Sequence, residues 1–262
     1  PIILFVILMV LLYIPPVQNL LRREVTAYAS KATGMQIQVE RIDLRFPLNL
    51  LVRGVEVIQQ PDTLLSLESL NVRVQAWPLL KGKVEVDEVT LSQVAVNSAN
   101  LIEGMQIKGV LGRFFLQSHG VDLSNETAVV NRTELSDTHI QLLMTDTTTT
   151  PKDTTASAPV NWKVNLHQLK LKNVSFGMKL PADSMKMAAY IGEATIDDAK
   201  ADLKNQFYGL KQFLLSGASA SYDTGEAQPS EGFDASHMAV RNIRIGLDSL
   251  LYEGRNMNAV IP

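Results

Sequence analysis

The sequence predicts a mainly β protein: an N-terminal transmembrane helix and a short amphipathic helix, followed by a long curved antiparallel β-sheet that forms an open apolar groove. Three observations predict this class. They are an apolar run at the start of the chain, a segment of helical periodicity after it, and a phrase of alternating apolar residues that recurs from residue 35 onward. We therefore expect an anchor over 1–16, a helix over 17–34 and a β-groove over 35–262.

Composition excludes several classes of function. The 262 residues carry 24 Lys and Arg against 27 Asp and Glu, a net charge of -3, which leaves no electrostatic footprint for nucleic acid. The chain has no Cys, which excludes a disulfide scaffold, a Cys-based zinc site and a Cys nucleophile. With 46% apolar and 19% charged residues it is too apolar to stay disordered. We expect a folded protein that acts through its surfaces, with no nucleic-acid partner.

The N-terminal run of apolar residues extends over 2–14 and ends at Pro15-Pro16. As a helix it would span roughly 20 Å, against a hydrocarbon core of ~30 Å, so we expect part of the segment to precede Pro1. A cleavable signal peptide is the alternative, but the residues after the run offer no Ala-x-Ala-like cleavage site. An uncleaved single-pass anchor is the favoured prediction, within a protein that continues beyond Pro262.

The next segment has the periodicity of one helix face. Apolar residues recur at spacings of three and four, at Val17, Leu20, Leu21, Val25 and Tyr28. Gly34 follows as a C-cap residue would. The helix could lie on a membrane surface or pack on the end of the sheet, and the pattern leaves both open.

The main signal is a phrase with apolar residues at positions 1, 4, 6, 9 and 11. Full copies begin at Val86, Leu166 and Ile191, a weaker copy begins at Val130, and partial copies begin at Val39, Leu67 and Val240. A spacing of two is the strand period, whereas a spacing of three inserts one residue that would turn the next pair to the wrong face. We expect a β-bulge or local kink to absorb each extra residue and to curve the sheet. The copies have no fixed period, which argues against a solenoid or propeller.

Two stretches depart from this pattern. Residues 145–159 are rich in Thr, Asp and Pro and lack large apolar groups, so we expect a flexible loop. Residues 198–210 fit either a strand or an amphipathic helix, and we predict a strand.

The sequence contains few residues in patterns typical of catalysis, cofactor binding or metal binding. It lacks the His-Glu-x-x-His, Gly-x-Ser-x-Gly and P-loop motifs, so we expect neither an enzyme nor a bound cofactor. His119, His139, His167 and His237 are far apart in the sequence, which favours surface histidines over a metal site. The acidic cluster of Asp197, Asp198 and Asp202 could bind a cation, but a solvated face is the favoured interpretation.

The order of these features resembles the start of AsmA-like proteins of the TamB family, the translocation and assembly module subunits. The resemblance rests on the anchor and helix, on Thr33-Gly34, on the Val39 copy that ends at Phe46-Pro47, on Gly54-Val55-x-Val57 and on the Val86 phrase. It implies an anchor in the inner membrane of a Gram-negative cell and a taco-shaped sheet that crosses the periplasm with an apolar inner surface. It also implies an outer-membrane barrel partner of the BamA or TamA type, bound through a C-terminal part beyond Pro262.

The leading hypothesis is a groove that carries phospholipid acyl chains toward the outer membrane while the head groups stay in water. The residues expected to line it are Val86, Val89, Leu91, Val94, Val96, Leu166, Leu169, Leu171, Val174 and Phe176. For each of them ordinary sheet core is the competing interpretation. The alternative functions are an assembly factor whose strand edges receive outer-membrane barrel strands by β-augmentation, and a passive envelope stalk.

Overall fold

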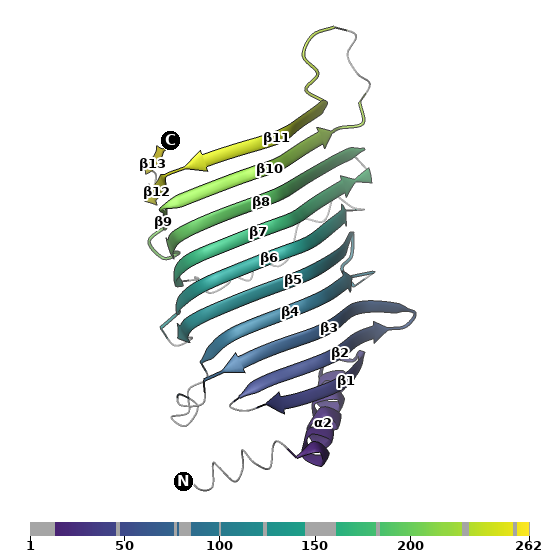
Figure 1. Cartoon of the computed structure of the whole chain (residues 1–262). Helices are drawn as coiled ribbons and strands as arrows, with labels where there is room; N and C mark the ends of the chain where they lie inside the picture. The colour runs from purple at the N-terminus through teal and green to yellow at the C-terminus, as the bar shows by residue number, and fades with distance from the viewer. Residues whose placement is uncertain are drawn as a thin grey trace.

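The computed structural model describes residues 14–45, 48–75, 78, 85–99, 101–122, 125–144, 161–181, 184–226, 231–253 and 256–261. Within them the chain forms one open, curved, mixed sheet of 13 strands with a helix at one end (Figure 1). The predicted fold class is confirmed at this level, because the protein is mainly β and the sheet is long, curved and not closed on itself.

Helix α2 covers Pro15–Thr33 and lies where the amphipathic helix is predicted. It begins with prolines in its first turn, where their missing N–H groups leave no helical hydrogen bond unmade, and ends at Gly34, whose φ of 70° closes it in the left-handed conformation. No helix in the described part of the chain is long and apolar enough to cross a membrane. Residues 1–13, which hold most of the predicted anchor, lie outside the described residues, so the anchor stays a prediction.

The strands are β1 Gln36–Arg45, β2 Asn49–Gln59, β3 Asp62–Val74, β4 Val86–Asn97, β5 Met105–Asp122, β6 Thr127–Met144, β7 Lys163–Leu180, β8 Met185–Asp202, β9 Phe207–Leu210, β10 Gln212–Asp223, β11 His237–Leu247, β12 Ser249–Glu253 and β13 Asn256–Val260. They pair largely with their neighbours in the chain. Strands β9 and β10 both pair with β8, so together they act as one long interrupted strand. Strands β12 and β11 pair with β9 and β10 respectively and act as a second such strand.

The prediction of a fully antiparallel sheet is wrong at one place, because β6 and β7 are parallel. The end of β6 at Met144 and the start of β7 at Lys163 therefore lie at opposite ends of the paired strands. A parallel pair needs a connection of a dozen or more residues, and the segment between these strands is long enough. The predicted flexible loop over 145–159 belongs to that segment and lies outside the described residues.

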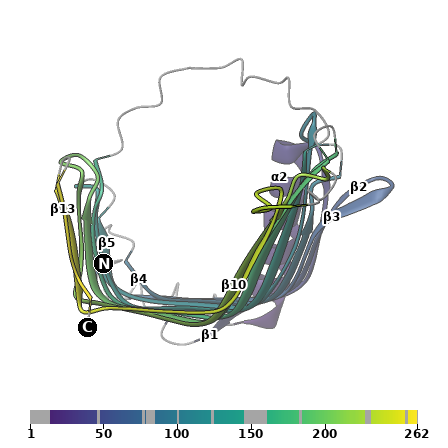
Figure 2. The same cartoon turned by 90° about the horizontal axis from the view of Figure 1, so that it is seen from above.

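Seen from above, the sheet is bent into a U with two walls and a floor, one wall carrying β13 and the other the end of β10 (Figure 2). The bends coincide with the spacings of three in the sequence phrase. The first corner line is defined by the second such spacing of β7 and by the positions that face it on the neighbouring strands. It contains Glu40, Gly54, Glu68, Gln93, Gly112, Asp137, Asn173, Gly192 and Gly217. The second corner line lies at the other spacing and contains Asn131, His167, Asp198 and Lys211.

The bends of neighbouring strands face one another, so pairing continues across them. Gln93 and Asp137, with φ of 48° and 51°, flank Gly112, and the register on either side of it is unbroken. From β1 to β10 the strands insert the same extra residue at this line, so no strand gains a residue over its neighbour and a bulge in one strand is not the device used. The pairing of β10 with β11 is the exception, because its register shifts between Leu215 and Ala218 and again between Ala218 and Ala220. Another register shift lies away from the line, between Gln117 and Gly120.

The ambiguous stretch over 198–210 is strand, as predicted, with a turn inside it. Strand β8 continues to Asp202, residues 203–206 turn, and β9 returns alongside β8. The side chain of Asp202 accepts hydrogen bonds from Asn205 and so fixes the turn.

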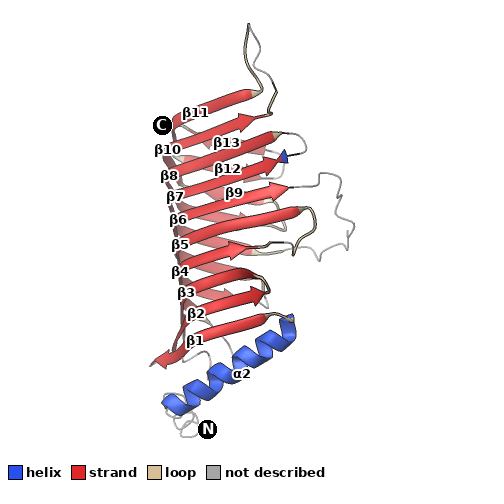
Figure 3. Ribbon diagram, turned by 90° about the vertical axis from the view of Figure 1, so that its right-hand side faces the viewer, coloured by secondary structure: helices blue, strands red, loops and turns tan. Residues whose placement is uncertain are grey.

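The ends of the sheet differ. At one end α2 runs along β1 (Figure 3). Gln18 and Arg22 donate side-chain hydrogen bonds to the β1 carbonyls of Leu44 and Val39, and the Ser30 hydroxyl accepts one from the Ile37 amide. The helix thus occupies hydrogen-bonding groups that an edge strand would leave free. At the other end, among the strands that the structure describes, β11 pairs only with β10 and β13 only with β12.

Candidate functional site

The residues predicted to line a groove come from β4 and β7, which are separated by β5 and β6. The strand register joins them into common rows that cross the sheet. Leu91, for example, faces Phe114, which faces Leu135, which faces Leu171. Because alternate residues of a strand lie on opposite faces, the members of these rows share one face of the sheet.

The rows extend beyond the two predicted strands. The Leu171 row contains Ile42, Val52, Leu70, Leu91, Phe114, Leu135, Leu171, Ala194, Leu215 and Ile245. The Leu169 row contains Leu44, Leu50, Val72, Val89, Leu116, Thr133, Leu169, Ile196, Phe213 and Leu247. These rows run from β1 to β11 and lie between the two corner lines, on the floor of the U.

Further rows lie on the walls. The Val174 row contains Val39, Val55, Leu67, Val94, Leu111, Thr138, Val174 and Ile191. The Phe176 row contains Ile37, Val57, Leu65, Val96, Gly109, Ile140, Phe176, Ala189, Ala220 and Val240. On the other wall, Leu166 lies between Val130 and Ala199, and Val86 faces Val74.

This face is not buried as a protein core would be. Of the predicted groove residues, Val96 and Phe176 are 37% and 41% exposed and the others are half-buried, while Ile140 in the same row is 40% exposed. Among the described elements, the main contacts of each strand are with its sheet neighbours, while α2 contacts β1. The rows thus form a large apolar surface that no second packed layer of the described elements covers, although such a layer usually covers one face of a sheet.

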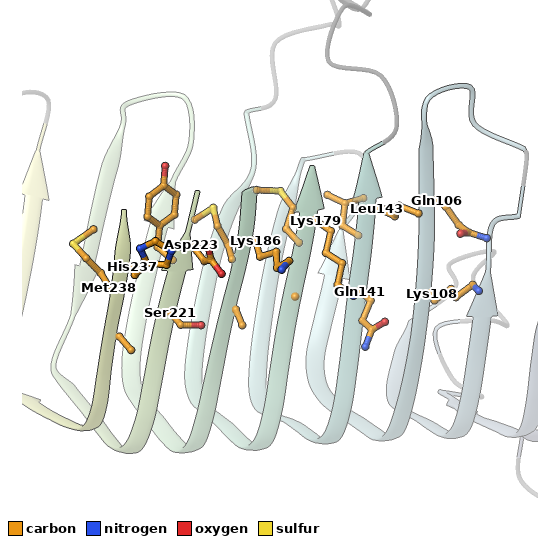
Figure 4. A pocket seen from close by; sticks show the side chains of 17 residues that line it. Gln106, Lys108, Gln141, Leu143, Lys179, Lys186, Ser221, Asp223, His237 and Met238 are labelled. Atoms are coloured by element: carbon orange, nitrogen blue, oxygen red, sulfur yellow. Dashed lines mark ion pairs between the residues drawn. The ribbon is translucent and has the colours of Figure 1, made fainter. Parts of the chain in front are cut away.

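The opposite face is polar, and sequence reasoning missed the depression on it. A row of small residues, Gly177, Ala188, Ser221 and Ala239, crosses β7, β8, β10 and β11. Next to it lie Leu143, Lys179, Lys186, Asp223 and His237, and together they line a cavity of about 710 Å³ that reaches Gln106 and Lys108 on β5 (Figure 4). Only the pairing of distant strands brings these side chains together, so no sequence motif could have revealed it.

The acidic cluster of β8 is engaged with basic and amide groups. Asp198 lies 3.1 Å from His167 Nδ1 and 3.7 Å from Lys211 Nζ, and the hydrogen bond from His167 is the main reason why the pKa of Asp198 is below its ordinary value. Asp202 also has a lowered pKa, chiefly because the Asn205 amide donates to it. These partners favour the solvated-face interpretation.

The four histidines lie on different strands, and His139, His167 and His237 have separate partners. His139 Nδ1 lies 2.7 Å from the Ser175 hydroxyl, while His237 lies between Asp234 at 3.0 Å and Asp223 at 3.5 Å. In the part of the chain that the structure describes, no group of His and carboxylate side chains is arranged to hold a metal ion.

The arrangement as a whole offers hydrophobic contact on one face and charged contact on the other. The apolar rows repeat from strand to strand, so a ligand would meet nearly the same surface at each step along the sheet. No family model matches this chain, and no curated protein matches it either.

Proposed function

We propose that this chain is an inner-membrane-anchored periplasmic bridge that carries phospholipid acyl chains along an apolar β-groove toward the outer membrane, without catalysis. The observation that carries the proposal is the set of apolar rows that run along one face of the sheet, which no other element in the described part of the chain covers. The AsmA-like arrangement of the sequence supports the cellular setting.

Burial supports placing the apolar rows on the concave side of the U. Thr138, Ala194 and Ala218, next to the first corner line, are only 3–4% exposed. Side chains on the inside of a corner crowd one another, whereas those on the outside splay apart. The corner residues themselves, Gln93 and Asp137, are exposed. The apolar face is thus the inner one, and charged side chains lie outside it.

The dimensions suit an extended hydrocarbon chain. Rows that cross ten strands span roughly 43 Å, because neighbouring strands lie ~4.8 Å apart. Each buried methylene contributes ~0.8 kcal/mol, so an acyl chain of about 15 carbons gains roughly 12 kcal/mol in a dry groove. Since neighbouring strands offer equivalent sites, movement needs only sliding from one to the next.

Photo-cross-linking in cells tests the proposal. A photoreactive residue at Leu91, Leu169 or Val174 is expected to capture phospholipid, and the same residue at exposed Lys172 is the control that should not. Cross-links from the inner positions only to protein would contradict the groove.

A charge placed in the groove separates a lipid conduit from a packed core. Val174→Asp is expected to abolish lipid capture at Leu169 while the urea midpoint changes little, because water reaches the uncovered face and hydrates the carboxylate. In a packed stalk the same unpaired charge would unfold the sheet. A cooperative loss of β-structure in Val174→Asp would therefore favour the passive stalk.

The free edge of β11 favours one alternative, an assembly factor that works with a BamA- or TamA-type barrel protein. In the described chain β11 pairs on one side only, and Val240 on it is 57% exposed, so a partner strand could add there. Cross-linking from Arg244 on β11 to nascent outer-membrane barrel strands, with no lipid captured at Leu169, would support this alternative over transport.

A further inference from the structure

A cavity of about 700 Å³ lies between α2 and the first two strands, at the end of the sheet that the helix caps. Its polar lining comes from Arg22, Arg23 and Thr26 on the helix and from Gln38, Glu40 and Glu56 on the strands. None of the apolar phrases predicts it, because it exists only where the helix meets the edge of β1.

Two polar atoms of this cavity are buried and lack a hydrogen-bond partner. Arg22 Nη1 donates to the Val39 carbonyl at 3.0 Å, but Arg22 Nε and Thr26 Oγ1 have no partner, and they are two of four such atoms in the described residues. A buried polar group left without a hydrogen bond costs about 1–3 kcal/mol. A ligand that accepts hydrogen bonds from both groups would remove this cost.

The charges of the cavity are of both signs and do not pair with each other. Within the described chain, Arg22 and Arg23 form no ion pair with Glu40 or Glu56, although all four line the same space. The cavity thus holds cationic groups on its helix side and carboxylates on its strand side. A ligand that carries an anion and a cation a short distance apart would satisfy both sides.

We propose that this cavity binds a zwitterionic phosphoester headgroup, with the phosphate on Arg22, Arg23 and Thr26 and a primary ammonium group on Glu40 and Glu56. The inference rests on the proposed carriage of phospholipid and adds to it a headgroup class. The same chemistry occurs in a free phosphoethanolamine ester, so the source of the headgroup is decided by experiment.

The test uses the whole 262-residue chain in an uncharged maltoside detergent. Glycerophosphoethanolamine, which has the headgroup without acyl chains, is expected to shift the amide NMR signals of Thr26 and Gly54, which line the cavity. Glycerol phosphate, which lacks the ammonium group, should bind more weakly. Absence of any shift with glycerophosphoethanolamine would overturn the proposal.

Variants locate the binding without relying on a folding defect. Thr26→Val keeps the side-chain shape and removes the unpartnered hydroxyl, so it should weaken glycerophosphoethanolamine binding roughly tenfold and leave the melting temperature unchanged or higher. Glu56→Gln should weaken glycerophosphoethanolamine but not glycerol phosphate. Lys31→Gln, on the same helix but outside the cavity, is the matched control. A lower melting temperature in Thr26→Val with unchanged binding would assign the hydroxyl a structural role instead.

Nanodiscs identify the source of the headgroup. Preferential binding to phosphatidylethanolamine discs over discs of an anionic lipid, lost in Thr26→Val, supports a membrane source, whereas binding of the soluble ester alone indicates a free ligand. If Leu169 captures lipid in cells and no headgroup binds the cavity, this inference fails while the groove stands. If the headgroup binds and Leu169 captures none, the cavity stands and the groove fails.

Discussion

The two corner lines bend the same sheet by different means. At the first line two strands carry glycine where a side chain would be crowded: a Cβ on Gly112 would lie 2.7 Å from the Cβ of Asp137, and one on Gly192 would lie 3.1 Å from the Gly217 carbonyl. At the second line the Lys211 amide donates to the Asp197 carbonyl, and exposed side chains add contacts, with His167 and Lys211 both on Asp198. Steric contact limits the first corner, whereas solvated polar side chains support the second.

This difference predicts how firmly each wall is placed. Close backbone packing is insensitive to pH and salt, whereas exposed ion pairs are weak and screened by salt. The wall beyond the first corner should therefore keep its angle to the floor, and the wall that carries β13 should be the adjustable one. The width of a groove built this way depends on the second corner.

The largest effect is expected from filling the first corner. Gly112→Ala should lower the free energy of unfolding by about 1–3 kcal/mol, because the new methyl group overlaps Asp137 and neighbouring carbonyls. Gly177→Ala is the matched control, since its nearest neighbour would be 4.0 Å away. Urea denaturation measures both, and equal midpoints would show that the first corner is not sterically fixed.

An increase of intermediate size in the free energy of unfolding is expected when a residue with positive φ at the first corner is replaced by glycine. Gln93 holds a φ of 48°, and such a conformation costs about 1–2 kcal/mol, partly offset by the ~0.5–1 kcal/mol entropy loss of glycine. Gln93→Gly should therefore stabilise the sheet by roughly 0.5 kcal/mol in urea denaturation. Asn173→Gly should gain less, because it also loses the 2.7 Å hydrogen bond from Asn173 to Asp137. A larger gain for Asn173→Gly would contradict this account of the corner.

The smallest change in stability is expected from a substitution at the second corner, and it depends on pH. The hydrogen bond from His167 is the main cause that lowers the pKa of Asp198, desolvation opposes it, and Lys211 adds to the lowering. A carboxyl group with a lowered pKa contributes stability above its unfolded pKa and loses it as the pH falls through the folded value, here below about 4. Urea midpoints between pH 6 and pH 3 should fall slightly less in Asp198→Asn than in the unchanged chain. An identical fall would show that this ion pair does not support the corner.

The sequence phrase predicts the strands and the position of each bend, because a spacing of three cannot continue a strand without turning it. It does not predict that the bends align, since alignment depends on which residue of one strand pairs with which residue of the next. Gly112 between Gln93 and Asp137 is an example: the three residues are distant in sequence and form one corner only after pairing.

The apolar pattern of the sequence predicts neither the parallel pairing of β6 with β7 nor the cavity beside α2, and the reasons are related. Strand direction after a long connection is not encoded in the alternation of apolar residues, which is the same for parallel and antiparallel neighbours. The cavity depends on the side chains of Arg22 and Thr26 meeting the edge of β1, a contact between elements that have no common period. Most of the predicted groove residues, by contrast, follow from the sequence phrase and lie in common rows, with Val89, Leu91, Val94 and Val96 joined to Leu169, Leu171, Val174 and Phe176.

Along a strand, the apolar residues that cross the floor are spaced by three, two and three positions. This order is the same in both chain directions. Strand β7 passes the rows in one direction and β8 in the other, yet both supply an apolar side chain at each row. The width and the length of the U-shaped sheet are consequently independent. The spacing within a strand sets the width, and the number of strands sets the length. Duplication of one hairpin would lengthen such a trough by roughly 10 Å without altering its cross-section. Strands can thus be added or removed without changing the cross-section of the sheet.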